Sequence, residues 1–437
     1  MKACLPLIAA AAVVLVPLRA SAQAWVSNPD FSEGIGIRTG NLELHPSIGG
    51  ELGYDSNLYR ASGSGPGESE VDVLKLRITP SLTLSTLGQQ RRNAATPPSF
   101  TFNGGAYASY NEYFPLDSSE DDVRERRNVG VGADAKLNVF PAGKVGFDLL
   151  ANYLRTIDTD GSSDDLAGEG FNRGSLRGGA GLTWRPGGGL FEWRGGYSIT
   201  YHYFENELYD PLANLQHEIN TRGRWRFLPR SALMFDSSYT FVRYAEGAAT
   251  QPDGDAVRAR IGFHGLVTYH LALLGMVGWG SSFYEPRTGA APRQFDSLVG
   301  NAEVRWFLQP RPDLEQATIT SGLSSIALGY TRSFSNSYYG AFFQRDRGYL
   351  QFSMFLLGAV AGGLEFGVSR VAYPEVPPEA SFSELRIDGR LFAEYRFTDT
   401  LATNATLMYD KVNSEEIAAE DLDYDRFQAY IGVRWFM

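Results

Sequence analysis

The chain ends on Asp423–Met437, DYDRFQAYIGVRWFM, and this stretch decides the fold. Taken in steps of two, it places apolar side chains on one face, namely Phe427, Ala429, Ile431, Val433 and Trp435. The other face carries Arg426, Gln428, Tyr430 and Arg434. A period of two is that of a β-strand. The apolar face runs for about ten residues, the length that a tilted strand needs to cross a hydrocarbon layer.

The end of this strand also carries a spaced motif, Tyr430-x-Gly432-x-x-Trp435-x-Met437. The motif resembles the C-terminal signal by which bacterial outer-membrane barrels are recognised for assembly, with Met437 standing where Phe is usual. The resemblance implies the barrel assembly machinery as a partner, with Tyr430, Gly432, Trp435 and Met437 as the assembly signal. The alternative is an ordinary edge strand at the C-terminus of a soluble sheet.

The other end of the chain predicts export. Met1-Lys2 is followed by an apolar run, Leu5–Leu18, and by the small residues Ala20-Ser21-Ala22, the pattern of a cleaved signal peptide. We expect residues 1–22 to be removed, residues 23–41 to form a periplasmic leader, and residues 42–437 to form one barrel domain. The only cysteine, Cys4, leaves with the signal peptide, so disulfides and thiolate metal sites are excluded.

The composition narrows the membrane class. The 437 residues include 48 Gly, 23 Tyr and 27 Phe, the net charge is −11, and no long helical period is present. Outside the signal peptide the longest nearly uncharged apolar stretch is 352–364, too short for a membrane helix. Open sheet edges cannot face lipid, so a membrane protein with this sequence must be a closed barrel. We therefore predict an all-β, transmembrane outer-membrane β-barrel of about 18 antiparallel strands.

The connections between the predicted strands alternate in length. One set is tight, as in Phe140–Lys144 and Arg185–Gly189. The other set is long and mostly acidic, as in Asp158–Glu169 and Asn413–Asp425. Outer-membrane barrels of Gram-negative bacteria have short periplasmic turns and long external loops. This assignment predicts that both the N- and the C-terminus are periplasmic, and that the barrel contacts outer-membrane lipid and lipopolysaccharide.

Within the predicted strands, basic and apolar residues occupy alternate positions along the chain. Arginine facing lipid at mid-membrane costs about 2 to 4 kcal/mol, so the parity that carries arginine is predicted to face the lumen. Candidate lumen-lining contacts for anions or sugars are Arg77, Arg124, Arg126, Arg177, Arg222, Arg224, Arg258, Arg260, Arg386, Arg390, Arg426, Arg434, Tyr107 and Tyr430. The competing interpretation is that these arginines pair with luminal Asp and Glu and stabilise the wall without selecting any solute.

The sequence offers little for catalysis. The five histidines are scattered and do not match a metalloprotease spacing. His202 is the one histidine predicted at an outer rim on the luminal parity. We expect no catalytic residues, no metal, no cofactor and no nucleic-acid partner.

The first predicted strand carries a second resemblance. Pro46–Tyr59, PSIGGELGYDSNLY, resembles the opening strand of the β-barrel porin type 2 family and of the outer-membrane barrels of exopolysaccharide export systems. The resemblance implies a conduit for a secreted polysaccharide, anionic or neutral, working with a periplasmic polysaccharide export protein. Two alternatives stay open: a diffusion porin for small anionic solutes, and a non-conducting structural or adhesive barrel. Within the motif, Asp55 and Asn57 are predicted to bond neighbouring backbone at the rim in preference to a ligand.

Overall fold

The computed structural model describes residues 36–62, 70–87, 97–116, 123–124, 126–156, 172–244, 253–284, 294–308, 324–337, 342–356, 359–374, 381–414 and 423–437. The predicted signal peptide, most of the predicted leader and the centres of most long loops lie outside these residues. Among the described residues, no helix is long and apolar enough to span a membrane.

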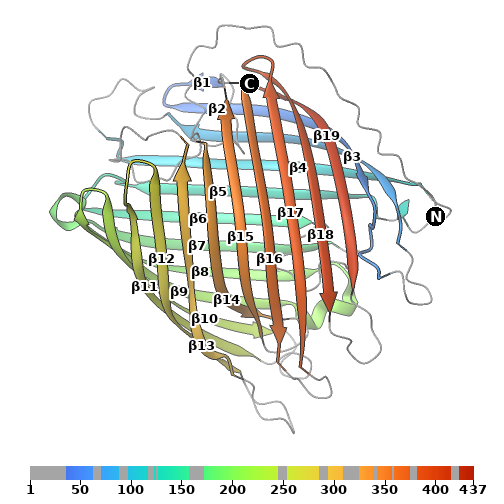
Figure 1. Ribbon diagram of the computed structural model, residues 1–437. Helices are drawn as coiled ribbons and strands as arrows, with labels where there is room; N and C mark the ends of the chain where they lie inside the picture. The colour runs from blue at the N-terminus through green and yellow to red at the C-terminus, as the bar shows by residue number, and fades with distance from the viewer. Residues whose placement is uncertain are drawn as a thin grey trace.

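Eighteen antiparallel strands form the wall of a closed barrel (Figure 1). They are β2 (Leu42–Asp55), β3 (Val73–Thr86), β4 (Phe100–Pro115), β5 (Asn128–Val139), β6 (Val145–Thr156), β7 (Arg173–Trp184), β8 (Phe191–Phe204), β9 (Asn214–Leu228), β10 (Ser231–Tyr244), β11 (Gly254–Leu266), β12 (Leu271–Tyr284), β13 (Asp296–Phe307), β14 (Ser325–Asn336), β15 (Phe342–Leu356), β16 (Val360–Tyr373), β17 (Phe382–Arg396), β18 (Leu401–Ser414) and β19 (Tyr424–Phe436). Each strand pairs with the next along the chain.

The barrel closes where the last strand meets the first. β19 pairs with β2 in the register Tyr430↔Gly53, Gly432↔Glu51 and Arg434↔Gly49. In Figure 1 the strands β14–β19 cross steeply in front of β4–β9, as expected when barrel strands tilt against the axis. The predicted fold class is therefore confirmed, including the strand number.

Two local predictions differ from the structure. A three-residue strand, β1 (Ile37–Thr39), pairs with the start of β2 inside the region predicted as leader. Arg124 and Arg126, predicted to line the lumen from a strand, lie in the connection before β5, which begins only at Asn128.

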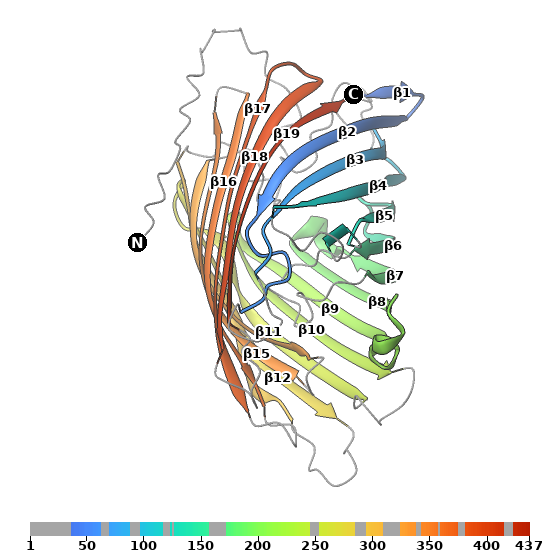
Figure 2. The same cartoon turned by 90° about the vertical axis from the view of Figure 1, so that its right-hand side faces the viewer.

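The connections alternate as predicted. Tight turns join β5 to β6, β9 to β10, β11 to β12 and β17 to β18, and the 3-10 helix η2 (Pro186–Gly189) joins β7 to β8. Gly187, Gly188 and Gly189 of η2 have positive φ, which only glycine adopts without strain. Most of the longer connections lie at the opposite end, where η3 (Glu207–Leu212) joins β8 to β9. The connections 87–99 and 308–324 are exceptions, since both are long and lie at the end that carries the tight turns. Met437 and β1 share the end that carries the tight turns (Figure 2).

The outer surface of the wall is apolar. Leu328 and Ile431 are each 64% exposed, and most outward-facing strand positions are Leu, Val, Ile or an aromatic residue. Four outward tryptophans lie near the tight-turn end, namely Trp184, Trp225, Trp306 and Trp435. Trp279 lies toward the long-loop end together with outward tyrosines, among them Tyr201, Tyr330 and Tyr409. Two aromatic girdles flanking an apolar band are typical of a transmembrane barrel.

Candidate functional site

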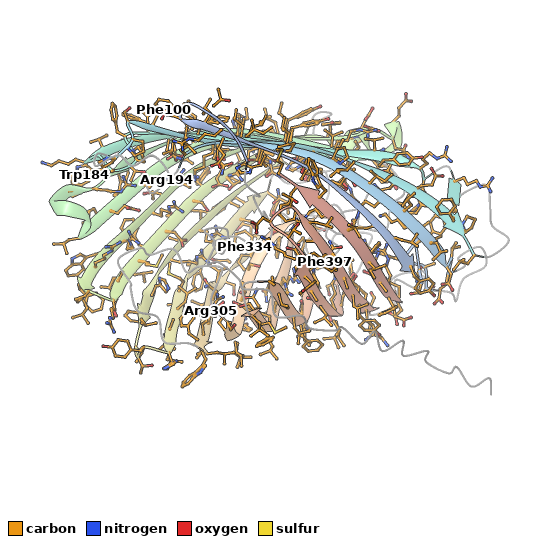
Figure 3. The ribbon with its side chains drawn as sticks, turned by 90° about the horizontal axis from the view of Figure 1, so that it is seen from above. Phe100, Trp184, Arg194, Arg305, Phe334 and Phe397 are labelled. Atoms are coloured by element: carbon orange, nitrogen blue, oxygen red, sulfur yellow. The ribbon has the colours of Figure 1, made fainter. Side chains whose placement is uncertain are left out.

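The inner face of the wall carries the charged side chains of the strands. The register places a basic set there: Lys75, Arg77, Lys136, Arg173, Arg177, Arg194, Arg222, Arg224, Arg226, Arg258, Arg260, Arg305, Arg345, Arg347, Arg386, Arg390, Arg396, Arg426 and Arg434. A smaller acidic set shares this face: Glu43, Glu51, Asp55, Asp134, Asp148, Glu192, Glu218, Asp236, Glu303, Glu365, Glu384, Asp388, Glu394 and Asp410. Figure 3 shows Arg194 and Arg305 on the inner side and Trp184 on the outer side.

The charged residues that point outward from the wall lie near the long-loop ends of their strands. Arg155 contacts Glu205 there, with 2.5 Å between Nε and Oε1. Arg332, Asp346 and Arg370 stand side by side on β14, β15 and β16. The middle of the outer face is left to apolar side chains, which is the arrangement that a hydrocarbon layer requires.

Half of the predicted lumen-lining arginines, six of twelve, are held by carboxylates. Arg77 lies 2.6 Å from Glu51, Arg260 lies 2.9 Å from Asp236, and Arg386 lies 2.6 Å from Glu384. Arg434 contacts Glu394 at 2.5 Å and Arg224 approaches Glu192 at 3.5 Å. For these residues the structure supports the competing interpretation, since a paired guanidinium stabilises the wall and carries little net charge toward a solute.

Four luminal arginines of the predicted set have no such partner. In the described part of the chain, Arg222, Arg258 and Arg390 form no ion pair, and Arg177 donates only to the Ser198 hydroxyl, at 3.2 Å. Arg222 stands between Arg194 of β8 and Asp236 of β10. Both neighbours form ion pairs with other residues: Arg194 pairs with Asp148, and Asp236 pairs with Arg260. The lumen therefore keeps guanidinium groups outside any described ion pair on β7, β9, β11 and β17.

The two arginines placed outside the strands have a different role. Arg126 stacks on the ring of Tyr59, with 4.2 Å between Cζ and the centroid, and donates to the Leu58 carbonyl at 3.4 Å. Its contact joins the connection before β5 to the connection after β2. Arg124 is exposed on the short helical turn beside Val123. Neither belongs to the luminal wall of β5.

The two predicted stacking tyrosines differ in exposure. Tyr107 faces the lumen beside Ser81 and Gly132 and is 42% exposed. A Cβ on Gly132 would lie 2.2 Å from the Tyr107 ring, so the glycine makes room for it. Tyr430 is only 5% exposed, because it packs over Gly53 beneath the Arg77 guanidinium, 5.0 Å from the ring centroid. The surface predicted for stacking at Tyr430 is therefore covered.

The Pro46–Tyr59 motif lies at the seam that closes the barrel. Arg426 Nε donates to Asp55 Oδ1 at 2.8 Å, and Gln428 donates to Asp55 Oδ2 at the same distance. Asn57 donates to the carbonyls of Ala61 and Asp425, at 2.8 and 3.2 Å. Both residues thus bond neighbouring backbone as predicted, since Asp55 Oδ1 also accepts from the Asn57 N–H at 3.3 Å. The additional bonds of Asp55 to side chains of β19 were not predicted, because β2 and β19 lie at opposite ends of the chain.

Apolar side chains gather inside the long-loop end of the barrel. Leu58, Val71 and Val123 of the connections pack on Val73 and Tyr113 of the wall. A second cluster contains Tyr284, Phe295, Val299, Phe334 and Phe342, with Phe295 and Phe334 stacked at 4.2 Å. Val73, Tyr113 and Val299 point into the lumen, where the strand positions otherwise carry mostly polar side chains. These apolar residues are explained by their packing with the connections, which the sequence pattern does not show.

Phe334 points into the lumen because the end of β14 separates from the adjacent strand β13. The pairing of β13 with β14 ends at Gly300↔Arg332, whereas β14 continues to pair with β15 as far as Asn336. Phe334 then lies over Gly280 of β12, where an added Cβ would lie 2.3 Å from its ring. This inward path narrows one side of the lumen (Figure 3).

A cavity of about 470 Å³ lies on the inner wall at the same end. Strands β6–β11 form one side of it, and residues 334–337 form another. His202, predicted at the luminal rim, is among its lining residues. Among the described residues, no group of three or more His, Cys, Asp or Glu could hold a metal ion.

No protein-family model matches the sequence, and no curated protein matches it either. Solved structures with a similar chain path include OpdL of Pseudomonas aeruginosa, at 11% identity and a TM-score of 0.46, covering 91% of this chain and 99% of that chain. OpdK, an outer membrane protein of the same organism, shows 12% identity and a TM-score of 0.45, with 90% and 99% covered. The FrpB iron transporter of Neisseria meningitidis shows 9% identity and a TM-score of 0.47, with 92% and 82% covered. At this level of similarity the likeness says nothing about what this chain carries, and the fold rests on the strand register.

Proposed function

We propose that this chain is an outer-membrane barrel pore through which small hydrophilic anions cross. The observation that carries the proposal is the set of luminal arginines without a carboxylate, Arg222, Arg258 and Arg390, in a wall where basic side chains outnumber acidic ones. Rings of basic side chains favour anions passing through a pore. A barrel of eighteen strands encloses an aqueous channel, so these charges face water.

The polysaccharide-export role is less well supported. It rests on the resemblance of Pro46–Tyr59, and the polar side chains of that motif are used in closing the barrel. Glu51 holds Arg77, Asp55 holds Arg426, and Asn57 bonds backbone across the seam. A motif whose chemistry is accounted for inside the wall gives no support to a particular cargo.

The reversal potential of the purified protein in a planar bilayer tests the proposal. Under a KCl gradient we expect a potential of the sign for chloride selectivity, and the triple variant R222Q/R258Q/R390Q should shift it toward zero. The matched control is R370Q, which removes an outward-facing arginine near the rim. A cation-selective current, or a control that shifts the potential as much as the triple variant, would contradict the proposal. Absence of any current would favour the non-conducting structural or adhesive barrel.

Export of polysaccharide is tested separately in cells. Loss of surface polysaccharide on deletion of the gene, with uptake of small anions unchanged, would favour export over the diffusion pore. Reduced uptake of small anions with normal surface polysaccharide would favour the diffusion pore.

We further infer that the chain reaches the outer membrane through the export and assembly route that its two ends indicate. Removal of residues 1–22 places the mature N-terminus at Gln23, which intact-mass spectrometry of the purified protein measures directly. A mature protein that still begins at Met1 would contradict a cleaved signal peptide.

A further inference from the structure

One luminal cavity combines an unpaired cation with neutral hydrogen-bonding groups and aromatic rings. The Arg258 cavity, of about 470 Å³, is walled by the long-loop halves of β6–β11 and by residues 334–337. Its volume lies within the range of small-molecule sites. We ask which solute these side chains fit.

Arg258 supplies the charge. Its register partners, Ser238 on β10 and Gly280 on β12, are uncharged, and Gly280 has no side chain to contact it. In the described part of the chain Arg258 forms no ion pair, and its buried Nε has no hydrogen-bond partner. The nearby Arg260 is instead held by Asp236, at 2.9 Å from both Nε and Nη2. Arg258 is therefore a guanidinium that lines a cavity and lacks a counter-ion in contact with it.

The rest of the lining is mostly neutral, apart from Arg173 and Glu218. Ser175, Asn214, Gln216, Thr240 and Asn336 line the cavity and can donate or accept hydrogen bonds. The Oε1 of Glu218 accepts a hydrogen bond from Asn220 at 2.9 Å. A solute with several hydroxyl groups would find partners on β7, β9, β10 and β14.

Aromatic rings flank these polar groups. Phe204 lies at the end of β8, and Phe334 lies on the opposite side, where β14 has left β13. Phe334 is fixed by stacking on Phe295 at 4.2 Å, so its position does not depend on a solute. The apolar face of a sugar ring packs well on such a surface.

We propose that the Arg258 cavity binds a hydroxylated carboxylate of sugar size, such as a uronic acid. This inference rests on the proposed function and specifies the class of solute that the proposed pore would carry. A carboxylate matches the planar fork of a guanidinium and takes two charge-assisted hydrogen bonds from it. The hydroxyl groups would bond to the neutral lining, and the ring face would pack on Phe204 or Phe334.

Binding to the purified barrel in detergent micelles tests the assignment without requiring a current. Isothermal titration calorimetry with glucuronate, glucose and benzoate separates charge from ring polarity. We expect saturable binding of glucuronate, at least about tenfold tighter than that of glucose or benzoate, because glucose lacks the charge and benzoate lacks the hydroxyl groups. In R258Q the affinity for glucuronate should fall by about tenfold or more.

The matched control is R226Q, which removes a luminal arginine at the tight-turn end of β9, outside the cavity lining. We expect R226Q to change the glucuronate affinity by less than about twofold. Retention of the heat-modifiable band in gel electrophoresis shows that each variant is folded. Equal losses in R226Q and R258Q, equal binding of benzoate and glucuronate, or absence of saturable binding would each overturn the assignment.

The outcome of the binding experiment can be distinguished from the outcome of the bilayer experiment that tests the proposed function. Anion-selective current without saturable glucuronate binding would reject the cavity and keep the pore. Glucuronate binding by a barrel that passes no current would reject the pore and keep the cavity.

Discussion

Arg426 of the last strand and Asp55 of the first form an ion pair that lies across the closure of the barrel. Arg426 Nε donates to Asp55 Oδ1 at 2.8 Å, Nη2 donates to Oδ2, and both side chains are almost fully buried. Gln428 donates to the same carboxylate. The two ends of the sheet, 371 residues apart, are thus joined by side chains as well as by the backbone ladder.

The first prediction concerns this seam. Replacing Asp55 by Ala leaves the Arg426 guanidinium buried without its partner, which costs about 3–5 kcal/mol in other proteins. We expect D55A to lower the midpoint of urea unfolding and to increase the unfolded band in unheated gel samples. The control is E365Q, because Arg347 keeps its second carboxylate, Asp388, and Glu365 is 42% exposed. Unfolding midpoints that are the same for D55A and wild type would contradict a stabilising role.

A second prediction uses two consecutive residues of β6. Leu149 faces outward and is 51% exposed, whereas Leu150 faces inward beside Gly179. An arginine at position 149 would face lipid, at a cost of about 2–4 kcal/mol near the bilayer midplane. L150R places the same charge in the aqueous lumen, directly opposite Lys136, with Asp134 and Asp148 two residues away along the two strands. We expect L149R to fold poorly into lipid vesicles and L150R to fold like the wild type. The opposite order would show that the inner and outer faces have been exchanged.

A third prediction concerns the inward ring of Phe334. Because this ring lies over Gly280 on the luminal side, F334A should enlarge the open cross-section and raise the single-channel conductance. The control is F100A, which truncates an outward-facing ring that is 54% exposed. An unchanged conductance in F334A would show that the narrowest part of the channel lies elsewhere.

A fourth prediction concerns the C-terminal motif. Trp435 faces outward and is 43% exposed, so its truncation removes little packing within the barrel. We expect W435A to slow insertion catalysed by the barrel assembly machinery in reconstituted vesicles, while spontaneous folding into detergent stays at the wild-type rate. W225A removes another outward tryptophan, 53% exposed, and serves as the control. Equal slowing of both variants would indicate a general effect of the aromatic girdle, with no specific signal.

The sequence by itself determined the class of fold and the orientation of the strands. In β19 the alternation of Phe427, Ile431 and Val433 with Arg426 and Arg434 already separates lipid from water, because a strand turns successive side chains to opposite faces. A similar alternation recurs in most of the predicted strands, and the alternating turn and loop lengths predict the direction of each one. An exception is β12 (Leu271–Tyr284), which carries no charged residue. Such information is local, so it can be read along the chain.

The tertiary structure decided which arginines are available to a solute. Arg77 and Arg258 occupy equivalent luminal positions in the sequence pattern, but Glu51 lies within reach of Arg77 and no described carboxylate contacts Arg258. Two features of the closed sheet set these distances. One is the pairing of the first and last strands, which brings Asp55 to Arg426, and the other is the point where β14 separates from β13. The physical reason is that a charge is compensated by whatever lies within a few ångströms in space, and in a closed sheet those neighbours are residues far apart along the chain.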